Sequence, residues 1–101
     1  MTMTGKERAA PRAEAHHLTP LVHVGHQGVT DSVVASLDDV LRTRELVKVQ
    51  IARNAEQSAK ETANELAART RAEVIQVIGR TTTLYRHNPE LERKAGEEPW
   101  R

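Results

Sequence analysis

Residues 21–30 read LVHVGHQGVT, and this stretch decides the fold that we expect for the whole chain. It opens with a short apolar run rich in valine, which is typical of a buried strand. Gly25 and Gly28 then bracket two polar residues in a GxxG pattern, and an amphipathic segment follows. The stretch therefore predicts a strand, a two-glycine turn and the first turn of a helix.

The turn predicts a site for anionic oxygens, above all phosphates. A glycine turn followed by a helix start exposes backbone N–H groups and the positive end of a helix dipole. GxxG is also the loop with which KH-type modules clamp a nucleic-acid backbone. The residues that we expect to contact the backbone are Gly25, His26, Gln27, Gly28 and Thr30. The spacing alone also fits a tight turn without a ligand, and the carboxylate of Asp31 would repel a phosphate.

Length and composition limit the class of protein. The chain has 101 residues, enough for one domain, with no cysteine, no phenylalanine and only Tyr85 and Trp100 as large aromatic residues. The core must therefore be aliphatic, and disulfide or thiolate chemistry is excluded. No apolar run approaches a membrane span and no signal-peptide core is present, so we expect a cytoplasmic protein.

The charge pattern limits how RNA could be bound. The net charge is +1, and no block of the chain is strongly basic, so affinity must come from the placement of charges. Lys48, Arg80 and Arg86 are candidates to extend the surface around the loop. Readers of single bases usually need several stacking aromatics, so recognition by backbone and shape is expected, as suits structured RNA. Tyr85 either stacks on a base or fills a gap in the core.

Hydrophobic periodicity predicts the remaining elements. We expect a helix with Pro11 in its first turn that runs to about His17, and a helix capped by Thr30 at its N-terminus. A strand at residues 46–52, a helix at 55–70 and a hairpin at 74–87 with Gly79 and Arg80 at its turn follow. Residues 1–5 are expected to be flexible, and 89–101 form a charged tail.

This order of elements predicts an α/β fold. The order α-β-α-β-α-β-β implies a mixed four-stranded sheet in a two-layer sandwich. The two main helices each carry one apolar stripe, so we expect the helices on one face of the sheet and the other face open.

Three motifs, in this order, resemble the CRM domain family, named for chloroplast RNA splicing and ribosome maturation. Residues 17–30 (HLTPLVHVGHQGVT) resemble its GxxG loop and the segment before it, and residues 45–49 (ELVKV) resemble its second strand. Residues 77–80 (VIGR) and 84–86 (LYR) resemble its closing hairpin. The match covers residues 6–88, which we expect to form a CRM-like RNA-binding domain, and the stand-alone bacterial members are the YhbY-like proteins.

The resemblance implies more than the residues show by themselves. It implies a fold similar to the C-terminal domain of bacterial translation initiation factor three. It also implies binding of ribosomal RNA through the glycine loop and association with precursors of the large ribosomal subunit. Family loops often carry Lys or Arg between the glycines, whereas this chain has His26 and Gln27.

Other functions fit the sequence less well. No nucleophile–base pair, HExxH motif or P-loop is present, so no enzymatic activity and no cofactor are expected. A metal site built from His16, His17, His23 and His26 is disfavoured, because two of them are adjacent and no cysteine accompanies them. The alternative that stays open is a protein-interaction module that docks a ribosomal protein or assembly factor without touching RNA. We expect a monomer.

Overall fold

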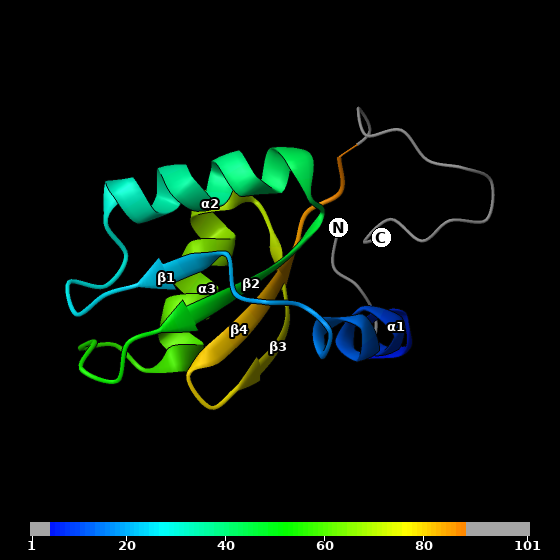
Figure 1. Cartoon of the computed structure of the whole chain (residues 1–101), viewed down its shortest axis with the longest axis horizontal. Coiled ribbons are helices and arrows are strands. Elements are labelled where there is room, and N and C mark those ends of the chain that lie inside the picture. The colour runs from blue at the N-terminus through cyan, green and yellow to red at the C-terminus, as the bar shows by residue number, and fades with distance from the viewer. Residues whose placement is uncertain (1–4, 89–101) are drawn as a thin grey trace.

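The computed structural model describes residues 5–88, and Figure 1 shows their arrangement. In chain order the elements are α1 (Gly5–Ala15), β1 (Val22–Val24), α2 (Asp31–Thr43), β2 (Leu46–Ile51), α3 (Ala59–Thr70), β3 (Glu73–Ile78) and β4 (Thr81–Tyr85). The predicted order of elements is confirmed. Within the described residues, no helix is both long and apolar enough to span a bilayer.

The four strands form one mixed sheet, as predicted, and their order in the sheet is β1-β2-β4-β3. β1 runs parallel to β2, and β4 is antiparallel to both of its neighbours, β2 and β3. Gly79 has φ +59° at the turn between β3 and β4, a conformation that favours glycine. The order leaves β1 and β3 at the two edges of the sheet.

The main core lies between the sheet and the helices α2 and α3. Alternate residues of β2 (Val47, Val49 and Ile51) point into this core and are at most 1% exposed. Leu37 and Leu41 of α2 and Leu66 of α3 are fully buried against them. The core is aliphatic, as the composition requires, and the prediction that the two main helices share one face is confirmed.

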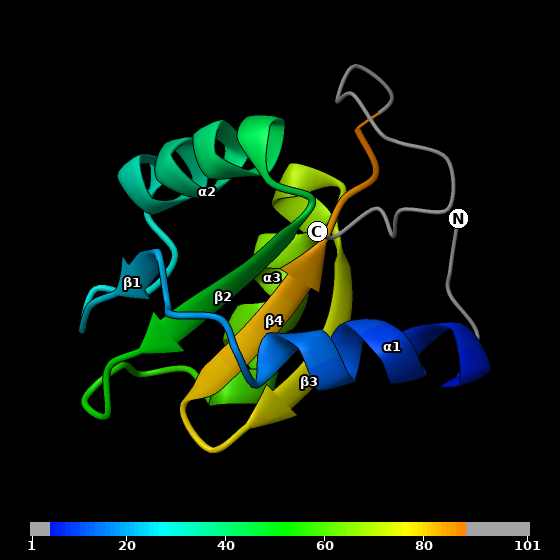
Figure 2. The same ribbon diagram turned by 45° about the vertical axis from the view of Figure 1, so that its right-hand side comes forward.

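The opposite face of the sheet is not fully open, because α1 lies across part of it. Figure 2 shows α1 in front of β3 and β4, with α3 behind the sheet. The side chain of Ala15 is fully buried, and Lys48 Nζ donates to the Ala15 carbonyl oxygen at 3.2 Å. Arg12 Nε donates to the carbonyl oxygen of Ile75 at 3.4 Å, and Arg8 lies 3.9 Å from the carboxylate of Glu73. These contacts hold the helix on the sheet.

The predicted position of Pro11 in the first turn of a helix is wrong. Pro11 is the seventh residue of α1, in the helix interior, and it is buried. Proline inside a helix removes a backbone hydrogen bond and costs about 3 kcal/mol. Pro11 and Ala15 lie one turn apart on the same face of the helix, and both are buried, so contact with the sheet offsets this cost.

Several predicted boundaries shift by a few residues. α3 begins at Ala59 rather than at residue 55, because Ser58 caps the helix: the Ser58 hydroxyl accepts from Glu61 N at 3.1 Å. The Glu61 carboxylate in turn accepts from Ser58 N at 3.3 Å, which completes a capping box. β4 ends at Tyr85, two residues before the predicted end.

The predictions for the two ends fall mostly outside the described residues. The charged tail at 89–101 and residues 1–4 of the predicted flexible N-terminus are not described, and Gly5 belongs to α1.

Candidate nucleic-acid interface

The GxxG loop is a tight turn that connects β1 to α2. Gly28 N donates to the Gly25 carbonyl oxygen at 3.0 Å, which closes the turn. Gly28 has φ +76°, in the left-handed region that side chains rarely adopt. The backbone conformation therefore requires glycine at position 28.

Gly25 is different, because nothing in the fold requires glycine there. Its φ lies outside the left-handed region, and a Cβ atom built on Gly25 would meet no heavy atom within 4 Å. A missing side chain at such a position leaves the backbone open to close approach from outside. The two glycines of the motif thus differ in what they do.

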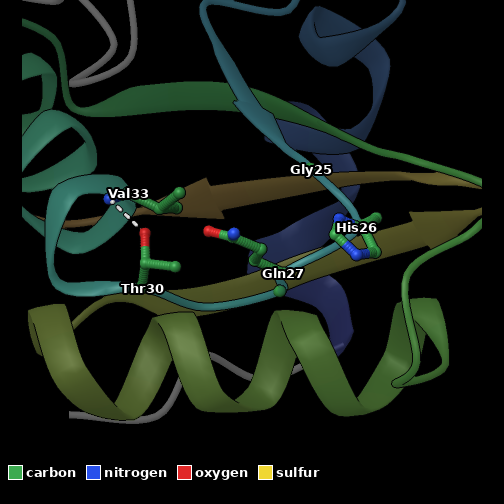
Figure 3. Close-up of a pocket in the computed structure, with 6 residues that line it drawn as sticks. Gly25, His26, Gln27, Thr30 and Val33 are labelled. Atoms are coloured by element: carbon green, nitrogen blue, oxygen red, sulfur yellow. Dashed lines mark hydrogen bonds between the residues drawn. The ribbon is translucent and has the colours of Figure 1, made fainter.

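His26 and Gln27, between the glycines, are exposed. Their main-chain amides donate no hydrogen bond to any other residue that the structure describes. A hollow of about 240 Å³ lies at the loop and is lined by Gly25, His26, Gln27, Gly28, Thr30 and Val33. In Figure 3 the Gln27 side chain points toward Thr30 and Val33, and His26 lies on the other side of the hollow. The loop can therefore offer both amides and side chains to a ligand.

Thr30 caps the N-terminus of α2, as the sequence predicts. Its hydroxyl accepts from Val33 N at 3.2 Å, the bond drawn in Figure 3. This bond satisfies one amide of the first turn and fixes the direction in which the helix leaves the loop. Thr30 also lines the hollow, where its hydroxyl oxygen already accepts the hydrogen bond from Val33 N.

An ion pair that the sequence analysis missed lies beside the helix start. Arg69 of α3 donates to the Asp31 carboxylate at 2.8 Å, although Asp31 itself is almost fully exposed, at 98% of its side chain. The Arg69 guanidinium also lies 3.8 Å from Glu65. Asp31 would repel a phosphate, and the arginine beside it offsets part of that charge. No local pattern pairs residues 38 positions apart, so only the packing of α3 against α2 reveals the contact.

Arg80 lies at the same end of the sheet as the GxxG loop. Val24, just before the loop, accepts a hydrogen bond from Ala52 N at 2.8 Å, and the Arg80 guanidinium donates to the Ala52 carbonyl oxygen. Figure 1 shows the loop after β1, the loop after β2 and the β3–β4 turn together at this end. Nε of Arg80 is buried without a hydrogen-bond partner among the described residues. The structure thus brings Arg80, but not every predicted cation, near the loop.

Lys48 and Arg86 lie elsewhere. Lys48 is half-buried and bonds the last carbonyl of α1. Arg86 donates to the Asp38 carboxylate at 2.6 Å, to the Asp38 carbonyl oxygen at 3.1 Å and to the Thr70 carbonyl oxygen at 3.0 Å. These internal bonds give both side chains structural roles.

The remaining candidates add little to the loop. Tyr85 is half-buried at the end of β4, opposite Leu46 and Glu73 in the neighbouring strands. Among residues 5–88, no three His, Cys, Asp or Glu side chains gather where they could hold a metal ion.

Comparison with known proteins adds an independent result. The sequence profile of the CRS1/YhbY (CRM) domain matches residues 3–86. The chain is 38% identical over 88 residues to the probable RNA-binding protein YqeI of Bacillus subtilis, covering 87% of this chain and 92% of that protein. It is 33% identical to a probable RNA-binding protein of Pseudomonas aeruginosa, covering 88% of this chain and 86% of the relative.

A solved structure agrees with these sequence matches. The solution structure of a Staphylococcus aureus protein, described as a candidate RNA-binding protein, superposes with a TM-score of 0.79. The two sequences are 35% identical, and the superposition covers 90% of this chain and 95% of that one.

Proposed function

This chain belongs to the CRS1/YhbY (CRM) domain family, and we propose that it binds RNA by holding a sugar-phosphate backbone against the GxxG loop. Relatives that match along most of their length are named RNA-binding proteins. The observation that carries the proposal is Gly25: neither its backbone conformation nor its surroundings require glycine. Because Gly25 has no side chain, a ligand can approach the backbone closely at this position.

The loop offers phosphate oxygens three kinds of contact. The amides of His26 and Gln27 have no internal acceptor among the described residues and donate to the oxygens. The side chains of both residues add hydrogen bonds, and the positive end of the α2 dipole favours the negative charge. Arg80 lies at the same end of the sheet and adds positive charge there, while its guanidinium also bonds the Ala52 carbonyl oxygen. No step of this mechanism breaks or forms a covalent bond, and we assign the protein no catalytic role.

The partner that we propose is structured ribosomal RNA in precursors of the large ribosomal subunit. The proposal of a ribosomal partner rests on the resemblance to stand-alone CRM proteins. It also implies that the protein acts in the cytoplasm. Sedimentation of cell extract tests it directly. The protein should travel with large-subunit precursors, and migration on its own would contradict the ribosomal partner while leaving RNA binding intact.

Gly25→Asp tests the loop itself. It places a Cβ atom and a carboxylate where the phosphate must approach, and the open space around Gly25 lets the fold accept them. Ala13→Asp on the exposed side of α1 makes the same change in charge on another face and serves as the matched control. The probe is a labelled pool of RNA hairpins with randomised ten-nucleotide loops, and the readout is fluorescence anisotropy.

We expect Gly25→Asp to abolish binding and Ala13→Asp to leave it unchanged. Contact with about four nucleotides predicts a slope of roughly −3 for log K against log salt with unpaired RNA. A folded Gly25→Asp variant that binds like the wild type would falsify the loop proposal. A flat salt response would favour the protein-interaction alternative instead.

A further inference from the structure

A second hollow lies beside the GxxG loop, between the edge strand β1 and helix α2. Its volume is about 180 Å³, and it is lined by Leu21, Val22, His23, Ser32, Val33 and Ser36. Val33 also lines the hollow at the loop, so the two hollows are neighbours that share one wall. A strand of nucleic acid held at the loop would therefore lie next to the second hollow.

The walls of this hollow combine apolar surface with unused hydrogen-bonding groups. Leu21 is one of the two large hydrophobic side chains exposed in the described residues, at 47% of its surface. Ser32, Ser36 and His23 are also exposed, and their side chains bond no other described residue. Ser32 and Ser36 lie one helical turn apart, so their hydroxyls face the same side of α2.

The lining of this hollow carries no permanent charge, which suits a flat, uncharged ligand with polar groups along its edge. None of the six lining residues is acidic or permanently charged. A carboxylate in the lining would repel nucleic acid, and a lysine or arginine would favour a phosphate over a base. The hollow has neither, whereas the loop next to it offers amides that suit phosphate.

We propose that this hollow holds one unpaired nucleobase of the RNA whose backbone lies on the loop, an inference that rests on the proposed function. The face of the base packs on Leu21 and Val33. The hydroxyls of Ser32 and Ser36 donate to or accept from the base edge. A single base held in this way needs none of the several aromatic residues that open-sheet RNA readers use.

This arrangement determines which class of RNA the protein selects. A paired base has its hydrogen-bonding edge occupied and is stacked in a helix, so it cannot enter the hollow. The ligand is therefore an unpaired nucleotide in a loop, bulge or end, next to the phosphates that the GxxG loop holds.

A pair of tryptophan variants on α2 tests the inference. Ser36→Trp fills the hollow from an exposed position, and Ala35→Trp adds the same bulk at the neighbouring exposed position, which does not line the hollow. Leu21→Ser, also at an exposed position, removes the apolar wall and provides a second variant. Circular dichroism melts confirm that each variant folds.

The probe is the tightest-binding hairpin recovered from the randomised pool, together with versions in which one loop base at a time is abasic. A fully paired duplex of the same length is the comparison. We expect Ser36→Trp and Leu21→Ser to weaken hairpin binding about tenfold or more, with Ala35→Trp unchanged. One abasic position should weaken wild-type binding similarly, and Ser36→Trp should show no further loss at that position.

The outcomes separate this inference from the proposed function. Equal affinity for the hairpin and the duplex overturns the inference, as does wild-type affinity of both hollow variants. If one of these results is found and Gly25→Asp still abolishes binding, the loop proposal holds and only the inference about the hollow fails. If Gly25→Asp binds like the wild type, the loop proposal fails, and sensitivity to Ser36→Trp would then locate the RNA at the hollow only.

Discussion

Arg86, just after β4, donates to the Asp38 carboxylate of α2 across 2.6 Å, and its guanidinium also bonds the Thr70 carbonyl oxygen at the end of α3. One side chain thus joins the sheet to both helices of the main core. Arg86 is 21% exposed, and its bonds occupy it inside the protein. Arg86 therefore has a structural role, because its bonds hold both helices in place against the sheet.

Arg86→Met should lower the free energy of unfolding by about 1–3 kcal/mol, because it removes charge-assisted bonds and leaves acceptors in α2 and α3 unsatisfied. Urea unfolding measures the loss. Arg44→Met removes an exposed arginine at the end of α2 and should change stability by less than about 0.5 kcal/mol. The RNA affinity of the folded Arg86→Met variant should stay within about twofold of wild type. A much larger loss of affinity would show that Arg86 contacts RNA.

The ion pair should also make stability depend on pH. The hydrogen bond from Arg86 lowers the pKa of Asp38 below its ordinary value of 3.8, against the opposing effect of desolvation. A lowered folded-state pKa adds stability that is fully present above the unfolded pKa and is lost as pH falls through the folded value. Asp38→Asn should therefore be less stable than wild type at pH 7, with a difference that shrinks below about pH 4. Urea unfolding at pH 7, 4 and 3 checks this, and a constant difference would contradict it.

The two loop glycines should respond differently to alanine. Gly28→Ala forces a side chain into φ +76° and should cost about 1–2 kcal/mol of stability. Gly25→Ala meets open space and should leave stability unchanged or slightly raised, because alanine restricts the unfolded chain. RNA affinity should nevertheless fall in Gly25→Ala, since its methyl group stands in the path of the phosphate. Thermal melts and anisotropy titrations separate the two effects, and a destabilised Gly25→Ala would show that the fold does need this glycine.

Pro11→Ala should stabilise the protein. Alanine restores a helix hydrogen bond and removes the clash of the ring with the preceding turn, together worth about 3 kcal/mol in a helix interior. Against this, the buried ring loses two methylene groups, at about 0.8 kcal/mol each. The net gain should be about 1 kcal/mol, seen as a higher urea midpoint. A loss of stability would mean that the packing of the buried proline ring contributes more than the restored helix geometry.

The sequence alone predicted much of the fold and the place of the candidate site. The periodicity that predicted the strand at 46–52 and the helix at 55–70 depends on neighbours within a few positions. The same is true of the Thr30 cap and of the turn at Gly79 and Arg80. Periodicity and capping chemistry therefore revealed the element order, the mixed sheet and the loop between β1 and α2. The loop's own amides and side chains needed no tertiary information to be identified.

Tertiary structure decided which surfaces are free. α1 packs on β2 and β3 and covers part of the face expected to be open, and its residues Pro11 and Ala15 are buried. Packing also gave Lys48, Arg80 and Arg86 internal carbonyl or carboxylate partners, and it brought Arg69 to Asp31. A long cationic side chain bonds whatever acceptor the fold brings within reach, and that acceptor lies far along the chain. Apolar periodicity encodes the elements, whereas these long-range partners follow only from how the elements pack.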